Sequence, residues 1–436
     1  MTGHCGLIYP WDGAATPFST SPRSRPSAEY CRAVTQVLET QVCVAGGGPA
    51  GLVHALLLAR AGIPVVVLEK HNDFLRDFRG DTVHPTTLRI MDELGFIDEF
   101  LRLPHTKITS VAFDTDGTIR RFGTFSALKR LGFRQPYIAL MPQWDFLDFL
   151  AEKASAYPEF TLIRNAEVTE LIFDGDRVVG VRTPELEVRA KLVVAADGRK
   201  SAVRAASGLQ LAAASSPIDV LWFRLKWRPG DPRELFAVIR RGLLLAMIYR
   251  GDYWQIAYPM PKGLNLRDGS LEAFKERLVS ARPQLRDHVD DLQSWDDTSQ
   301  LDVRVDRLKT WWRTGLLCIG DAAHAMSPVG GVGINLAVAD AVAAANILWA
   351  PLREGRLTNA DLAKVQRRRE LPARIIQAGQ VLIQNVAIKP NLKGDLSPIR
   401  VPRVIGRGPL QFIPPIIVGR GFRPEHVRSP DVHASA

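Results

Sequence analysis

The sequence predicts an α/β fold, with a three-layer, Rossmann-like nucleotide-binding domain, an inserted antiparallel β-sheet domain and C-terminal helices. Three observations support this prediction. The short apolar run 40–45 (TQVCVA) ends in glycines and leads into a helical pattern and a second apolar run. Two later apolar runs, 191–196 and 315–319, also end in turns that contain glycine and aspartate. Two long segments between these runs alternate apolar and polar residues, as half-buried antiparallel strands do.

The elements follow in a β–turn–α–β order at the start. Residues 40–45 predict a strand, 52–61 a helix and 64–68 (PVVVL) a buried strand of a parallel sheet. Residues 191–196 and 315–319 predict two further buried strands. A long helix is expected to begin near 331–335, and a second helical region covers 361–385.

The changes in residue pattern along the chain predict five parts. The predicted parts are a loose N-terminal tail (1–38), a discontinuous nucleotide-binding domain (39–106, 138–215 and 303–350), a substrate or cap domain (107–137 and 216–302), a C-terminal helical region (351–390) and a surface-wrapping tail (391–436).

The composition is that of a globular chain with a sizeable core, since 46% of its 436 residues are hydrophobic. The net charge is +10, but the basic residues are scattered and no recognition motif accompanies them, which excludes nucleic acid as a partner. The one basic cluster, 367–369, predicts a solvated helix face. Four cysteines show no disulfide or metal-ligand pattern, so Cys43 and Cys318 are expected to be reduced core residues of a cytoplasmic protein without a metal site. No charge-free run of 18 apolar residues occurs, which argues against a spanning helix.

The first loop is the glycine-rich sequence GGGPAG at 46–51. Gly46 permits a tight turn, Gly48 allows a phosphate to approach the backbone, and Gly51 lets the helix pack on the strand. Glu69 ends the next strand, where a carboxylate can accept hydrogen bonds from both hydroxyls of a ribose. Together these residues predict the adenosine and pyrophosphate end of a dinucleotide site.

Two further loops predict the rest of an extended ligand. Asp197 begins the second loop, DGRKS, directly after an apolar strand. The third loop is GDAAHAMSPVGGVGIN at 320–335, in which Asp321 can bind a polyol hydroxyl and the following helix directs its positive end toward the ligand. A second phosphate loop so late in the chain indicates a long dinucleotide held at both ends, and FAD is the first candidate.

The three loops, in the order GGGPAG, ADGRKSAVR and GDAAHAMSPVGGVGIN, resemble those of the p-hydroxybenzoate hydroxylase-like (single-component, class A) FAD-dependent aromatic monooxygenases. The resemblance covers about residues 41–374. It implies an FAD-binding domain, and NADPH or NADH as a transient co-substrate. It also implies an enzyme that hydroxylates a small hydrophobic aromatic or polycyclic substrate with O2 through a flavin C4a-hydroperoxide. Only one GxGxxG loop precedes a helix, which fits a nicotinamide without a domain of its own.

The resemblance also assigns residues. Arg79 corresponds to an arginine near the FAD pyrophosphate, Gln143 opens a helix near the flavin, and the backbone of Val168 meets the adenine. Asp197 is associated with both FAD and NAD(P)H, while Asp321 binds the ribityl chain. The expected cofactor-binding residues are Gly46, Gly48, Pro49, Ala50, Gly51, Glu69, Lys70, Arg79, Gln143, Val168, Asp197, Gly320, Asp321, Pro328, Gly331, Gly333, Ile334 and Asn335.

The candidates for substrate orientation or catalysis are His84, Arg224 and the tyrosines Tyr249, Tyr253 and Tyr258, of which His84, Arg224 and Tyr258 are preferred. The tyrosines can equally be core or lid residues. His84 follows a turn that, by the resemblance, passes near the flavin ring, although it can equally be a turn residue bonded within its own loop. Arg224 lies in an apolar strand, either as an anion clamp or as a surface residue. Tyr258 belongs to the predicted cap. His324 is expected to be structural and adjacent to the flavin.

Several alternatives stay open at this point. A Baeyer–Villiger or epoxidation outcome uses the same flavin hydroperoxide. A halogenase is disfavoured because the nearest tryptophan motif, Trp254-Gln255-Ile256, lacks its second tryptophan, and an isoprenoid reductase because the motif spacing fails. A non-catalytic binder of the same fold is disfavoured because all three loops are kept. The tail 399–423 allows a weak peripheral membrane contact, and we expect a monomer or homodimer.

Overall fold

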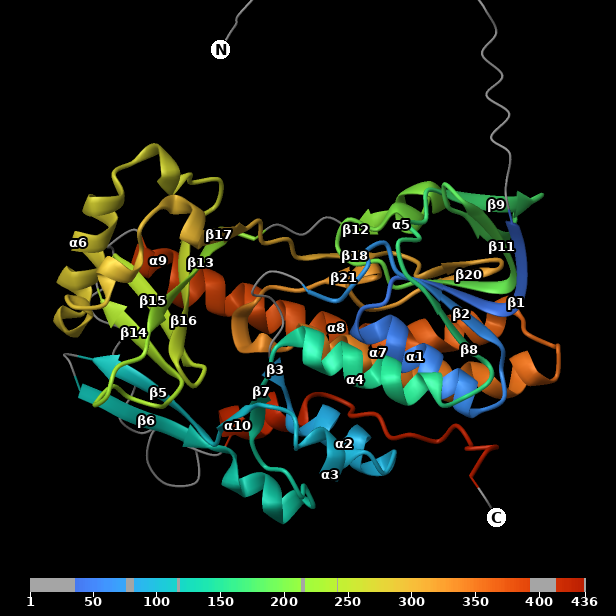
Figure 1. Cartoon of the computed structure of the whole chain (residues 1–436), viewed down its shortest axis with the longest axis horizontal. Helices are drawn as coiled ribbons and strands as arrows, with labels where there is room; N and C mark the ends of the chain where they lie inside the picture. The colour runs from blue at the N-terminus through green and yellow to red at the C-terminus, as the bar shows by residue number, and fades with distance from the viewer. Residues whose placement is uncertain are drawn as a thin grey trace, which may run out of the picture.

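A computed structural model of the chain describes residues 36–75, 82–115, 118–212, 216–240, 242–392 and 413–434 (Figure 1). Mixed α/β layers form one part of the molecule, and an antiparallel sheet backed by helix α6 forms the other. The predicted fold class is confirmed. Arg79, most of the predicted N-terminal tail and most of the segment 399–423 lie outside the described residues.

The main sheet has eight strands in the order β19-β20-β11-β1-β2-β8, with the β9–β10 hairpin joined to β11. Its strands are β1 (Gln36–Ala45), β2 (Val65–Leu68), β8 (Phe160–Ile163), β9 (Glu170–Asp174), β10 (Arg177–Arg182), β11 (Leu186–Ala195), β19 (Trp312–Arg313) and β20 (Leu316–Cys318). β1, β2, β8, β11 and β20 run parallel. β1 begins at Gln36, inside the predicted tail, and β11 is longer than the predicted strand 191–196.

Side chains alternate between the two faces of this sheet, because neighbouring residues of a strand point to opposite sides. Val42 and Val44 of β1 pack in the core on the helical side, whereas Cys43 and Ala45 pack in a second core on the other side. Cys43 and Cys318 are both fully buried, as predicted, and burial raises the pKa of the Cys43 thiol to about 12.

Helices cover one face of the sheet and continue toward the cap (Figure 1). The helices on this side and toward the cap are α1 (Pro49–Arg60), α2 (Pro85–Glu93), α3 (Ile97–Phe100), α4 (Gln143–Ser155), α7 (Gly333–Arg353), α8 (Asn359–Ile383), α9 (Lys389–Leu392) and α10 (Ile413–Arg420). The short helix α5 (Ala202–Ser207) lies on the other face, where Val203 packs in the second core. A π-helical stretch, Gln384–Ile388, joins α8 to α9, so the predicted helix 361–385 is longer than expected. The helix Val329–Arg353 has the length and composition of a membrane span, but 67% of its most apolar window is buried in this fold.

The cap is built on a seven-stranded sheet with the order β17-β13-β16-β15-β14-β5-β6. Its elements are β5 (Ser110–Thr115), β6 (Thr118–Thr124), β13 (Ile218–Lys226), β14 (Phe236–Arg240), β15 (Leu243–Tyr249), β16 (Tyr253–Pro261), β17 (Thr298–Leu301) and helix α6 (Leu271–Ala281). β5 pairs with β14 in parallel, and the other pairings are antiparallel. Two segments that are distant in sequence therefore share one sheet.

Short strands connect the two parts. They are β3 (Thr82–Val83), β4 (Thr106–Ile108) and β7 (Ile138–Leu140) in one three-stranded sheet, and β12 (Leu211–Ala212), β18 (Asp306–Leu308) and β21 (His324–Ala325) in another. After α10, residues 421–434, which we call the C-terminal strap, run along the helical layer (Figure 1). Arg60 of α1 forms an ion pair with Asp431 of this strap at 3.0 Å.

Candidate functional site

The predicted loops begin in one row at the same edge of the main sheet. Ala45 pairs with both Leu68 and Ala195, and Ala195 pairs with Cys318. Because parallel strands lie about 4.8 Å apart, these four strand ends span roughly 14 Å. The topology therefore brings together three loops and Glu69, although up to 270 or so residues of sequence separate them.

The glycines of the first loop have different surroundings. A Cβ at Gly46 (φ +103°) would lie 2.5 Å from the carbonyl oxygen of Ala196, and one at Gly51 would lie 2.0 Å from that of Gly46. A Cβ at Gly48 would meet no described atom within 4 Å. Two glycines are thus required by packing, while the third borders open space in front of the first turn of α1. That turn begins with Pro49 and has no side-chain cap among the described residues, so its N–H groups face this space.

Glu69 lies directly beside the first loop and is buried. Its Oε2 accepts a hydrogen bond from the Gly47 amide at 2.9 Å, and its Oε1 accepts one from the His71 amide at 3.1 Å. The Ala166 amide donates to the carbonyl oxygen of Glu69, which places the segment that leads to Val168 next to this end of the site. Glu69 and Val168 therefore lie near one another, as their predicted roles require.

The second and third loops contact each other directly. Arg199 Nε donates to Asp321 Oδ2 at 3.0 Å, and Arg204 Nη1 donates to the carbonyl oxygen of Ala322 at 3.0 Å. Asp197 Oδ2 accepts from the Val203 amide, but Asp197 Oδ1 and Arg199 Nη1 are buried without a hydrogen-bond partner in the part of the chain that the structure describes. Burial raises the pKa of Asp197. Unsatisfied buried polar atoms at this position suit a polar ligand.

The third loop also contacts the first. A Cβ at Gly320 (φ +58°) would lie 3.1 Å from Cβ of Ala50 and 3.3 Å from Cβ of Ala337, so only glycine lets the loop pass between α1 and α7. The start of α7 resembles that of α1: no side chain caps it within the described residues, and a Cβ at Gly333 would meet nothing within 4 Å. Two helix N-termini with free N–H groups thus border the same row of loops.

The Asn335 side chain forms hydrogen bonds within the protein, between α7 and the start of α2. Its Oδ1 accepts from the His84 amide at 2.8 Å and from Thr87 Oγ1 at 2.7 Å, and its Nδ2 donates to the carbonyl oxygen of Thr82 at 3.1 Å. Gly331 (φ +60°) is fixed in the same way, since its carbonyl oxygen accepts from Thr82 Oγ1 at 2.6 Å. The Asn335 side chain therefore joins α7 to the start of α2, and only its backbone is left to face a ligand.

The remaining predicted cofactor residues vary in exposure. Ile334 and Val168 are buried, Pro328 and Gln143 are half-buried with Gln143 as the first residue of α4, and Lys70 is exposed. Lys70 thus has no described contact that marks it for the site. The structure does not describe Arg79.

Asp340 is a buried site residue that the sequence analysis missed. Its Oδ2 accepts from the Gly320 amide at 3.1 Å and lies 2.5 Å from His324 Nε2, which explains why His324 is structural. Its Oδ1 accepts from Arg369 Nε at 2.9 Å. Arg369 is 1% exposed, so the prediction that 367–369 form a solvated helix face is wrong for this residue. An aspartate inside an alanine-rich helix was the available signal, because a buried charge needs a partner.

His84 lies under α10 and is almost fully buried. Its Nδ1 is 3.1 Å from the carbonyl oxygen of Val418, a contact that requires the proton on Nδ1. Burial lowers the pKa of His84 to about 4, although the carbonyl groups of Val418 and Gly331 act in the opposite direction. The ring is therefore neutral near pH 7 and suits a wall of the site better than a charged acid or base.

The cap sheet has two unlike faces. The outer face, which α6 covers, carries Phe223 and Leu245, both buried in an apolar core with Phe274 of α6. The inner face carries the row Ala237–Ala246–Ala257–Trp222, since these residues pair in register across β14, β15, β16 and β13.

The inner face points toward the nucleotide-binding domain. Ile248 of this face packs in one cluster with Val418, whose carbonyl oxygen meets His84, and α9 contacts β15 and β16. Figure 1 shows α6 on the opposite side of the cap sheet.

The two predicted cap residues lie on opposite faces. Arg224 is an exposed residue of the inner face, and its guanidinium lies 4.8 Å from the centre of the Tyr253 ring. Tyr258 belongs to the outer face, where its ring packs against Phe274 at 5.4 Å and burial raises the pKa of its phenol. Tyr258 therefore lies in the core between the sheet and α6, which agrees with the alternative that the tyrosines are core residues.

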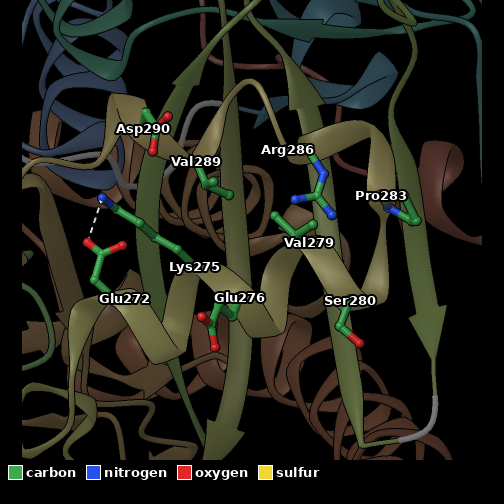
Figure 2. Close-up of a pocket in the computed structure, with 9 residues that line it drawn as sticks. All are labelled: Glu272, Lys275, Glu276, Val279, Ser280, Pro283, Arg286, Val289 and Asp290. Atoms are coloured by element: carbon green, nitrogen blue, oxygen red, sulfur yellow. Dashed lines mark hydrogen bonds and ion pairs between the residues drawn. The ribbon is translucent and has the colours of Figure 1, made fainter.

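A surface groove of about 550 Å³ lies on α6 and the turns that follow it (Figure 2). Charged side chains dominate its lining, including Lys275, which pairs with Glu272 at 3.0 Å. The groove lies on the outer side of the cap, so α6 and the sheet separate it from the three loops.

Comparison with known proteins agrees with this geometry. Residues 39–378 match a protein family described as "FAD binding domain". The chain is 35% identical over 342 residues to 6-methylpretetramide 4-monooxygenase of Streptomyces rimosus, a match that covers 76% of this chain and 80% of the relative. Among solved structures, p-nitrophenol 4-monooxygenase from Pseudomonas putida has a TM-score of 0.69 at 22% identity, covering 89% of this chain and all of that one. Anhydrotetracycline hydroxylase from Streptomyces rimosus has a TM-score of 0.67 at 23% identity, covering 88% and 76%. These two structures show the shared fold.

Proposed function

Because this chain belongs to the FAD binding domain family and is a flavin-dependent aromatic monooxygenase, we propose that it uses NAD(P)H and O2 to hydroxylate a polycyclic aromatic substrate. The observation that carries the proposal is the single row of strand ends from which all three loops begin, faced by the apolar inner face of the cap sheet. One region thus offers a dinucleotide site and an apolar wall.

The residues present fit FAD. The space in front of Gly48 admits a pyrophosphate, which the free N–H groups of α1 can bind. The unpartnered buried atoms Asp197 Oδ1 and Arg199 Nη1 suit the polar middle of the cofactor. The first turn of α7 and the open space at Gly333 suit the ring end, where a helix N-terminus stabilises negative charge.

The cofactor, once bound and reduced, supplies the electrons with which O2 is activated for aromatic hydroxylation. The protein residues then have binding and positioning roles in our proposal. Glu69 accepts hydrogen bonds from the ribose hydroxyls, and Asp321 binds the polyol chain. The neutral His84 forms part of the wall of the site beside the start of α7. The inner face of the cap is proposed to shield the reacting ring from water with its half-buried apolar side chains, among them Trp222, Ala246 and Ile248.

The substrate wall is the row of three alanines that ends at Trp222. Small side chains leave room for a flat ring system, and Trp222 can stack against it. Arg224, one position further along the same face, is proposed to orient a polar substituent. The name of the relative with 35% identity supports 6-methylpretetramide as the first compound to test.

The domain boundaries are likewise a proposal. They are supported by the sheet that joins β5 and β6 to the strands of 216–302, and by Asp114 of β5, which forms ion pairs with Arg240 and Arg282. A cytoplasmic location, the monomer or homodimer, and the weak membrane contact of the tail stay predictions.

The test is to measure NADH and NADPH oxidation by the FAD-loaded enzyme with 6-methylpretetramide, p-nitrophenol and a non-aromatic control, while peroxide and products are quantified. We expect one aromatic compound to stimulate oxidation, with little peroxide and a product that carries a new hydroxyl group on the ring or, for p-nitrophenol attacked at the nitro-bearing carbon, a quinone with release of nitrite. A ring-expanded product would indicate a Baeyer–Villiger reaction, and an epoxide would indicate epoxidation, in place of hydroxylation. Oxidation that no aromatic compound stimulates would contradict the proposed substrate class.

A further inference from the structure

A network of buried charges connects the third loop to the C-terminal strap. Asp340 of α7 holds the Gly320 amide and His324 with one carboxylate oxygen, and Arg369 of α8 with the other. Arg369 Nη1 in turn donates to Glu425 Oε1 at 3.1 Å. The turn, two helices and the strap, which are far apart in sequence, thus meet through consecutive side chains.

The strap side of this network is well defined. Glu425 is buried and also accepts from Arg368, with its Oε1 at 2.7 Å from Nε and its Oε2 at 3.2 Å from Nη2. Arg369 Nη1 has a second acceptor on the strap, the carbonyl oxygen of Arg423 at 3.2 Å. Arg368 and Arg369 of α8 therefore both bind the same short stretch of the strap.

The charges of Asp340, Arg369 and Glu425 depend on one another because all three side chains are buried. Burial acts to raise the pKa of Asp340, but the neighbouring His324 and Arg369 more than offset this and hold that pKa below its usual range. Removing one member of a buried charge pair leaves the other uncompensated, which is strongly unfavourable. If Arg369 lost Glu425, its hold on Asp340 would change, and with it the acceptor that fixes the Gly320 amide.

We propose that Arg369 and Glu425 are positioning residues for FAD, which act through Asp340 on the turn that carries Asp321. The C-terminal strap thereby sets how tightly the chain retains its cofactor. The inference rests on the FAD site proposed above, and it gives the strap a role that is separate from its contribution to folding.

The strap offers a matched control in Asp431. This residue anchors the same segment through the ion pair with Arg60 of α1, and it has no contact with the charge network. Asp431→Asn therefore weakens the docking of the strap, whereas Glu425→Gln weakens both the docking and the network. Asp321→Ala serves as the direct disruption of the site.

The experiment compares these three variants with the parent as full-length chains stripped of FAD. The Kd for FAD is measured by fluorescence titration, the environment of the bound flavin by visible circular dichroism, and the Tm of each apoprotein by calorimetry. We expect both variants to lower the Tm, and Glu425→Gln to lower it more, because Glu425 is buried with two arginine partners whereas Asp431 is partly exposed. Only Glu425→Gln should also raise the Kd, by about tenfold, and change the flavin spectrum.

Equal Kd values for Glu425→Gln and Asp431→Asn would overturn the inference if Asp321→Ala still weakens FAD binding. Unchanged binding by Asp321→Ala would instead overturn the assignment of the FAD site, and the inference with it. If Glu425→Gln does not fold, Glu425→Asp replaces it, since this variant keeps the charge and retracts the carboxylate by one methylene. An intermediate Kd is then expected, and a Kd equal to that of the parent would contradict the inference.

Discussion

In the nucleotide-binding domain, the proposed cofactor site consists mainly of backbone N–H groups at the starts of α1 and α7, whereas the inner face of the cap presents side chains alone. The first arrangement follows from strand register and from glycines that no other residue can replace. The arrangement in the cap follows from the alternation of side chains along a strand. Alternation determines the face to which each side chain points but does not restrict which residue stands there. We conclude that the cofactor end tolerates little change and that the cap is where substrate choice can vary.

The largest expected effect is on FAD binding and stability, and it should differ between two glycines of the first loop, Gly48 and Gly51. Gly48→Val places its side chain in open space, so we expect a stable apoprotein that has lost FAD binding because the pyrophosphate position is blocked. Gly51→Val forces its Cβ against the carbonyl oxygen of Gly46, 2.0 Å away, so we expect loss of both stability and FAD. The flavin content after purification and the Tm of the apoprotein check this. A Gly48→Val protein that is fully loaded with FAD would contradict the role of the first loop.

This contrast also explains how much the sequence could predict. The glycine loops and the buried strands that precede them could be predicted from the sequence, because tight turns after a strand depend on backbone geometry that only certain residues permit. The partners of buried charges were not readable, since Asp340 and Arg369 meet only after α7 and α8 pack together. Nothing in the local sequence separates Arg369, which is buried, from Arg367, which is exposed.

The cap illustrates the same limit with a different cause. Alternation in 218–302 predicted strands, but it did not assign a face to water, core or ligand. Tyr258 and Ala257 are neighbours on β16, and helix α6 places the first in the core, while the second stays on the inner face. A residue's role in such a sheet depends on which face the next helix covers, and this is a tertiary property.

The second prediction tests the two faces of the cap with neighbouring residues of β15. Leu245→Ala removes a buried outer-face side chain, and we expect a loss of about 2–5 kcal/mol in the free energy of unfolding with little change in substrate preference. Ala246→Leu fills the inner face, where we expect a small change in stability and a fall of at least about tenfold in kcat/KM for a polycyclic substrate. Urea unfolding and steady-state kinetics measure the two effects. The inner face would lose its proposed role if Ala246→Leu left the kinetics with large and small aromatic substrates unchanged.

The last expected effect depends on pH and concerns the buried histidines of the nucleotide-binding domain. Burial lowers the pKa of both His54 and His84 to about 4, so the folded protein binds fewer protons than the unfolded chain between that value and the ordinary 6.5. The stability that these neutral rings contribute is therefore complete above about pH 6.5 and is lost as the pH falls toward 4, by at most about 1.4 kcal/mol per pH unit for each ring. His84→Asn keeps a donor for the Val418 carbonyl oxygen but cannot titrate. It should therefore reduce the dependence of the free energy of unfolding on pH by the contribution of one histidine. Urea unfolding from pH 4.5 to 7.5 measures the slopes, and an equal slope for His84→Asn and the parent would show that this ring does not oppose protonation in the folded state.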